Sequence, residues 1–163
     1  MKKILLGIFV LGIYFNCFGQ TKSETYEYLN EKLEMYKLND IQTNYIYMFQ
    51  EVEIDNKKVI NFLEFCTTFK LCSTAYFLNP TDYAGITTKD KTETKWIEIF
   101  FKPSSVQTQQ IDLDTKKRYK GDSTSRITVI LDKNTPESEI GKMKKAFLHL
   151  LKLYGVEKKE LFD

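Results

Sequence analysis

The chain is poor in the residue types that most catalytic sites need. Its 163 residues include one histidine, three cysteines, three prolines and one tryptophan. A single histidine excludes His-rich zinc sites and a Cys2His2 site. The glycines are isolated, so the sequence has no phosphate-binding glycine loop and no Gly-x-Ser-x-Gly nucleophile elbow. The sequence therefore offers no catalytic constellation, and we expect no metal ion and no cofactor.

The remaining acid and base candidates are few. His149 falls on a lysine-rich helix face, where a solvated surface residue is expected rather than a catalytic base. Glu51, Glu53 and Asp55 share one face of a strand, a spacing typical of the polar side of an edge strand. An enzyme that works with carboxylates such as Glu51, Glu53 or Glu98 is the alternative that this pattern leaves open.

The first residues have the pattern of an export signal. Lys2 and Lys3 precede an apolar run over residues 4–15, followed by small residues Cys17 and Gly19. Twelve helical residues rise about 18 Å, less than the roughly 30 Å core of a bilayer. We expect residues 1–19 to be a signal peptide, cleaved after Gly19, and the product to be periplasmic or secreted. Cys17 leaves a second possibility, an acylated lipoprotein of the outer membrane with a structural role in the envelope.

The mature chain is expected to be electrically balanced and to fold as one domain over residues 20–163. The full chain has 24 Lys and Arg against 22 Asp and Glu, and loss of Lys2 and Lys3 leaves 22 of each. A nucleic-acid binder needs an excess of basic charge, so nucleic acid is not an expected partner. No further apolar run predicts a transmembrane helix in the mature chain.

Hydrophobic periodicity predicts a helix, about seven strands and a second helix. The first helix is expected over residues 24–38, with Thr21 and Glu24 or Ser23 alone as the N-terminal cap. The second follows Thr135 as N-cap and Pro136 as first helical residue, and ends at Gly155. The strands are expected at residues 43–54, 59–66, 71–78, 86–88, 95–102, 106–113 and 126–131, with a polar loop over 114–125.

Strands in series without intervening helices predict an α+β protein with a mainly antiparallel sheet, curled or closed into a barrel. Seven such strands closed by an amphipathic C-terminal helix resemble the pleckstrin-homology superfold, which implies binding more than catalysis. The signal ending at residues 18–20, the opening helix at 24–29, the loop at 78–82 and the helix at 146–153 resemble small exported proteins of Bacteroidetes-type bacteria. That resemblance implies no particular activity.

Cys66 and Cys72 are the two cysteines of the mature chain, and their pairing depends on the segment between them. Six residues of one extended strand span about 20 Å, whereas a disulfide needs Cα atoms within about 7 Å. Two buried thiols are expected if the strand continues. A disulfide is expected if residues 67–70 form a hairpin loop. The spacing is not that of a Cys-x-x-Cys redox motif.

Tyr45, Tyr47 and Phe49 form an aromatic row on one side of the first predicted strand. An outward row would be a binding surface, whereas an inward row would pack beneath the N-terminal helix. With export and charge balance, the row leads to the hypothesis of a non-catalytic module that binds a protein or peptide.

Overall fold

The structure is a computed structural model that describes residues 21–38, 45–66, 72–112, 115 and 117–156. Two helices and eight strands follow one another in this part of the chain as α2 (Lys22–Met35), β1 (Tyr45–Ile54), β2 (Lys57–Cys66), β3 (Cys72–Leu78), β4 (Tyr83–Asp90), β5 (Thr94–Phe101), β6 (Gln107–Ile111), β7 (Arg118–Lys120), β8 (Arg126–Asp132) and α3 (Glu137–Leu153). All strand pairs are antiparallel. The predicted α+β class with an antiparallel sheet is thus confirmed.

The strands form a five-stranded sheet, β1-β2-β3-β6-β7, and a three-stranded sheet, β4-β5-β8. Short bends connect the two sheets. β3 leads through a short 3-10 helix, Pro80–Asp82, into β4; β5 leads into β6, and β7 into β8. Pairing persists across the bends, because Val106 bridges to Thr124 and the Lys102 amide donates to the Asp82 carbonyl.

The sheet does not close into a barrel. β1 and β7 are the edge strands of the larger sheet, and β4 and β8 are those of the smaller one. β7 lies in the segment predicted to be a polar loop, since all three of its residues are exposed and give no apolar alternation. β5 lies centrally in its sheet, as the apolar character of its two faces predicted.

The helix ends follow local sequence signals. Thr21 and Glu24 form the predicted capping box of α2, in which each side chain accepts from the other residue's backbone N–H. α3 begins one position later than predicted: Pro136 is the N-cap, and the Thr135 hydroxyl donates to the Asp132 carbonyl instead.

The C-terminal end of α3 is a Schellman motif. Gly155 has φ +85°, a conformation that glycine adopts without steric cost. The amides of Gly155 and Val156 donate to the carbonyls of Lys152 and Leu151. This arrangement confirms the predicted stop of the helix at Gly155.

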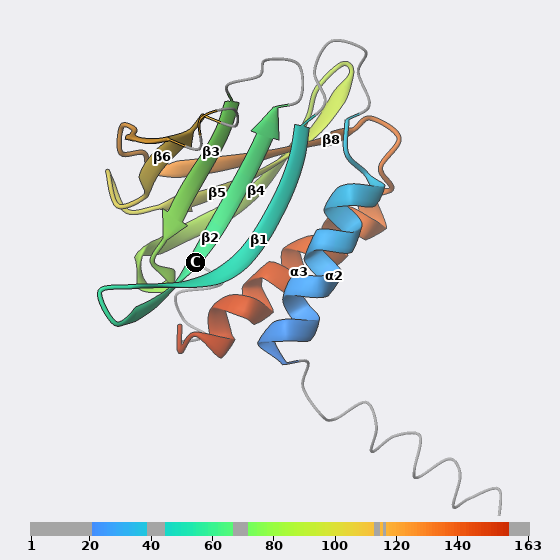
Figure 1. Ribbon diagram of the computed structural model, residues 1–163. Coiled ribbons are helices and arrows are strands. Elements are labelled where there is room, and N and C mark those ends of the chain that lie inside the picture. Colours follow the sequence, from blue (N-terminus) through green and yellow to red (C-terminus); the bar gives the residue numbers. More distant parts are fainter. Residues whose placement is uncertain (1–20, 39–44, 67–71, 113–114, 116, 157–163) are drawn as a thin grey trace, which may run out of the picture.

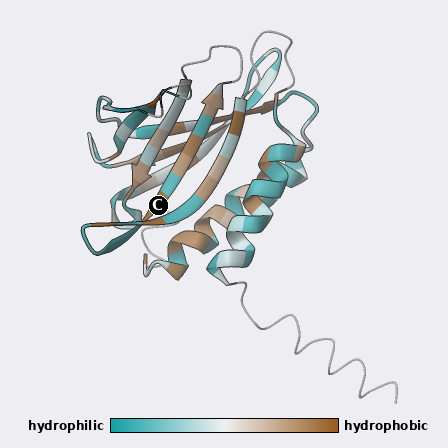
Figure 2. Cartoon of the chain, viewed as in Figure 1, coloured by the Kyte–Doolittle hydropathy of each residue, from teal (hydrophilic) through white to brown (hydrophobic). Residues whose placement is uncertain are grey.

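One face of the five-stranded sheet, which we call the inner face, contributes to a core shared with both helices and the smaller sheet. Figure 1 shows α2 and α3 side by side along the β1 edge. Phe62 is fully buried, and Phe49 from β1 contacts Phe147 from α3 with ring centroids 5.7 Å apart. The visible side of α2 is mostly hydrophilic (Figure 2), because its apolar residues Tyr26, Leu29 and Leu33 are buried in this core.

Candidate functional site

The opposite face of the five-stranded sheet, which we call the outer face, has no described helix against it. It carries every second residue of β1, β2, β3, β6 and β7. Its apolar members are Ile46, Met48, Val52, Val59, Leu63, Phe65, Ala75, Phe77 and Ile111, its amides Gln50, Asn61, Gln107 and Gln109, its hydroxyl Ser73, and its cations Arg118 and Lys120. Leu63 and Ala75 are buried on this face and its other apolar members are half-buried. A contiguous apolar sheet face that no described helix covers is typical of an interaction site.

The outer face is hollowed around Phe77. Three hollows adjoin there, with volumes of about 380 Å³ toward β7, 380 Å³ toward β1 and 320 Å³ toward the β1–β2 turn. Phe77 lines all three. Each hollow is large enough to receive a side chain, and together they make the outer face a continuous recess.

Three polar atoms at this face are buried without a hydrogen-bond partner among the described residues. They are Asn61 Oδ1, Ser73 Oγ and Gln109 Oε1. Asn61 is only 5 % exposed, and it lines the hollow toward β1 together with Gln109. An unpaired buried polar group costs about 1–3 kcal/mol. Asn61 and Gln109 line a hollow, so rotation of either amide would let a ligand donate a hydrogen bond to its oxygen, whereas Ser73 lines none of the three hollows.

The predicted aromatic row lies on the inner face, beneath the helices. Tyr47 and Phe49 are 3 % and 2 % exposed, and Tyr45, which is half-buried, stacks on Tyr47. The Tyr47 hydroxyl accepts from the Ile130 amide at 3.4 Å, which ties β1 to the edge of the smaller sheet. Of the two placements considered for this row, the structure has the one that packs against the core, and Tyr47 and Phe49 offer no surface to a partner.

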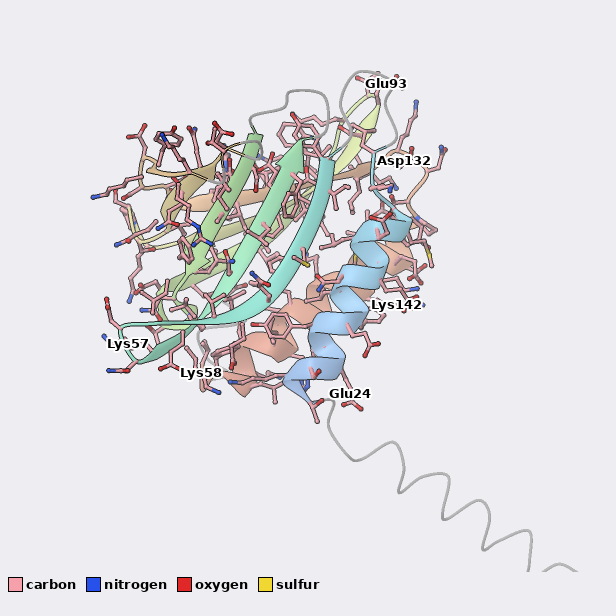
Figure 3. All side chains as sticks on the ribbon, viewed as in Figure 1. Glu24, Lys57, Lys58, Glu93, Asp132 and Lys142 are labelled. Carbon is pink, nitrogen blue, oxygen red and sulfur yellow. The ribbon has the colours of Figure 1, made fainter. Side chains whose placement is uncertain are left out.

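Glu51 is held in a polar network between the helices and β1. Its carboxylate accepts from the Tyr154 hydroxyl at 2.6 Å and lies 3.3 Å from Lys22 Nζ and 3.0 Å from Lys58 Nζ. The Tyr154 hydrogen bond and the two lysines lower the pKa of Glu51 to about 2. Figure 3 shows Glu24, at the start of α2, at the same end of the molecule as Lys58. A carboxylate with so low a pKa is a weak general base, which favours a structural role.

The depressed pKa of Glu51 predicts a loss of stability in acid. A carboxyl with a lowered folded-state pKa stabilises the fold above its ordinary pKa of 4.5, and this contribution is lost as the pH falls from about 5 toward 2. Glu51→Gln should therefore be less stable than the wild type at pH 7, and the difference should shrink toward a pH of about 2.5. Urea unfolding at these two pH values measures it, and a difference independent of pH would contradict the assignment.

The other candidate carboxylates lie apart from Glu51 or are exposed. Glu98 is fully buried, with Lys89 Nζ 2.5 Å from one oxygen and Arg126 Nη1 2.9 Å from the other. Glu53 is exposed near the β1–β2 turn, and Asp55 occupies that turn with φ 50°. The structure thus gives Glu51 and Glu98 separate ion pairs and does not assemble the acids into one site.

Cys66 and Cys72 are brought together by the antiparallel pairing of β2 and β3. The ladder places Cys66 directly opposite Cys72. Cα atoms of opposed residues in an antiparallel pair lie about 4.5–5.5 Å apart, within the range that a disulfide spans. The reversal that a disulfide requires is therefore present in the backbone. Cys17, the candidate for lipidation, lies outside the described residues.

We expect Cys66 and Cys72 to form a disulfide when the protein folds under oxidising conditions. Mass spectrometry after alkylation without reductant should show no modified cysteine in the mature chain, and a cross-linked peptide that joins the two residues. Closing so short a loop stabilises the fold by about 2–3 kcal/mol, so reductant should lower the melting temperature. Two alkylated cysteines in the oxidised protein would contradict this expectation, and Cys66→Ser with Cys72→Ser is the control.

The sequence patterns did not identify the outer face as a binding surface. The binding hypothesis made from the sequence concerned the aromatic side of β1. The available signal is the apolar character of both sides of this strand: Ile46, Met48 and Val52 alternate with the aromatic row. The two described helices pack on one face of the sheet, so neither of them covers the second apolar face.

Comparison with protein-family models, curated proteins and solved structures finds no match to this chain. Within the described ranges, no group of three or more His, Cys, Asp or Glu residues could hold a metal ion. No helix in the part of the chain that the structure describes is long and apolar enough to cross a membrane. The outer face is therefore the feature of the molecule from which a function can be inferred.

Proposed function

We propose that the protein is an exported, non-catalytic module that binds a peptide segment of another protein on its outer face. The observation that carries the proposal is an apolar recess that no described helix covers and that Asn61 and Gln109 line with amides whose oxygens lack a described partner. A peptide matches both the unpaired oxygens and the apolar hollows. Its backbone N–H groups can donate to amide oxygens, and its side chains can fill the hollows.

Phe77 supports the proposal as the aromatic residue at the centre of the recess. It lines all three hollows, with Leu63 and Ile111 beside it in the hollow toward β1. Binding energy at protein interfaces concentrates in such central apolar and aromatic residues. The amides around Phe77 then set the orientation of the bound chain through hydrogen bonds.

Two neighbouring glutamines provide a matched test. Gln109 lies on the outer face and lines two hollows, whereas Gln110 is exposed on the other side of the same strand. Peptides should first be selected from a displayed random library against the purified protein, and their affinity measured by titration calorimetry. Gln109→Ala should weaken binding of the selected peptides about fivefold or more, because one hydrogen bond contributes about 1 kcal/mol.

Gln110→Ala serves as the control and should bind like the wild type. The proposal fails if no peptide is enriched, or if the two variants bind the selected peptides equally well. A lowered melting temperature in Gln109→Ala alone would be detected in the same samples, and affinity is compared only between variants that remain folded.

Export and anchoring are also proposed, and they concern residues 1–20, which lie outside the described residues. Cleavage after Gly19 would give a mature chain that begins at Gln20, which sequencing of the exported protein tests. A lipoprotein anchored through Cys17 would incorporate labelled fatty acid, and Cys17→Ser would not. The likeness to the pleckstrin-homology superfold and to exported Bacteroidetes-type proteins is likewise proposed; α3 packed beside antiparallel sheets supports the former.

A further inference from the structure

Two cations stand at the β7 end of the outer face. Arg118 and Lys120 are both exposed and, being two positions apart on one strand, project to the same side. Neither forms an ion pair with any of the described residues, although eleven ion pairs occur elsewhere among them. Arg118 lines both hollows of about 380 Å³ that meet at Phe77.

The opposite end of the same recess carries charges of both signs, because Lys57 lines the hollow toward the β1–β2 turn together with Asp55 and Asp82. Glu53, on β1, lines the hollow toward that strand, whereas Arg118 reaches the same hollow from β7. Five strands cover four spacings of about 4.8 Å, so β1 and β7 lie about 19 Å apart, the length of roughly six extended residues. A short extended peptide can therefore cross the recess, and a terminal carboxylate is the group that complements the two cations at the β7 end.

We propose, on the basis of the proposed function, that the ligand is the C-terminal end of a peptide whose terminal carboxylate is bound by Arg118. A guanidinium matches a carboxylate with two parallel hydrogen bonds, and Lys120 adds positive charge beside it. The last apolar side chains of the peptide occupy the hollows at Phe77. The amides of Asn61 and Gln109 bind its backbone.

The test selects peptides from a random seven-residue library, displayed with free C-termini, against the purified mature chain. Each selected peptide is synthesised as the free acid, as the C-terminal amide, and as the amide with an internal aspartate. We expect the amide to bind about tenfold or more weakly than the acid, since hydrogen bonds to charged groups exceed neutral ones. Arg118→Gln should cause a similar loss for the acid, and Arg118→Lys a smaller one.

Lys145→Gln, which changes an exposed cation on α3, is the matched control and should leave affinity unchanged. Equal binding of acid and amide, with Gln109→Ala still weakening both, would overturn the carboxylate assignment and leave the outer face as the binding site. If the amide peptide with an internal aspartate binds as tightly as the free acid, Arg118 binds an acidic side chain. That result would overturn the assignment of Arg118 to the terminal carboxylate. The absence of any selected peptide would overturn this inference and the proposed function together.

Discussion

Phe62→Ala is expected to lower the free energy of unfolding by about 3–5 kcal/mol. Phe62 is fully buried on the inner face and packs against Phe49, Tyr47 and Tyr76, with ring centroids 4.8, 5.5 and 5.6 Å away. Alanine leaves a cavity at the centre of this aromatic cluster, which the neighbouring side chains cannot refill. Urea unfolding at neutral pH measures the loss.

Phe77 on the outer face is the matched control. It is half-buried and faces the recess, so Phe77→Ala should cost only about 1–2 kcal/mol of stability. The same substitution should weaken binding of the selected peptides about tenfold or more. Equal losses of stability at Phe62 and Phe77 would show that the outer face is covered in the folded protein, and would contradict its assignment as a binding surface.

Asn30→Ala is expected to destabilise the protein by about 2–4 kcal/mol, since removing the amide leaves two partly buried backbone groups unpaired at about 1–3 kcal/mol each. The Asn30 side chain pairs with the edge of β1 like a further strand. Its Nδ2 donates to the Phe49 carbonyl at 2.9 Å, and its Oδ1 accepts from the Phe49 amide at 2.8 Å. Thermal or urea unfolding measures the change.

Asn30→Asp and Glu27→Ala are the controls for this contact. Asn30→Asp keeps an acceptor for the Phe49 amide but sets a carboxylate oxygen against the Phe49 carbonyl, so at neutral pH the loss of stability should be at least as large as in Asn30→Ala. Glu27 is exposed on α2, and Glu27→Ala should change stability by less than about 0.5 kcal/mol. An Asn30→Ala variant as stable as Glu27→Ala would show that the β1 edge does not depend on this side chain.

The parts of the fold that follow local rules could be predicted from the sequence. The capping box of Thr21 and Glu24 and the stop of α3 at Gly155 depend on residues within one turn of helix. The β1–β2 turn is equally local, because Asp55 and Asn56 adopt positive φ, which these residue types tolerate. Central placement of β5 followed from its two apolar faces.

The parts that depend on distant contacts could not be predicted in the same way. The three residues of β7 are exposed, and they form a strand because they pair with β6. No local sequence pattern indicates this pairing. Pairing across the bends depends on segments distant in sequence, such as those of Val106 and Thr124. The sequence could not predict whether the aromatic row faces inward or outward. Both faces of β1 are apolar, and only distant contacts decide which of them is covered.

The candidate site was accessible only through topology. Gln109, Asn61 and Arg118 are far apart in sequence or belong to different strands, and each alone resembles an ordinary surface residue. The sheet order places them on one face around Phe77. Glu51, in contrast, was a candidate site residue in the sequence but is not part of the candidate site in the structure. Its partners Lys22 and Tyr154 come from the two helical segments and give it a structural role.

The most direct test of the outer face as the binding surface is site-specific photo-crosslinking with a selected peptide. A photoreactive benzoyl-phenylalanine replaces Gln107, an exposed residue that lines two of the hollows, or Lys145 on α3 as the control. We expect the peptide to crosslink from position 107 and not from position 145, with competition by excess unlabelled peptide. Crosslinking from position 145 alone, or from neither position while the peptide binds, would contradict a binding site on the outer face.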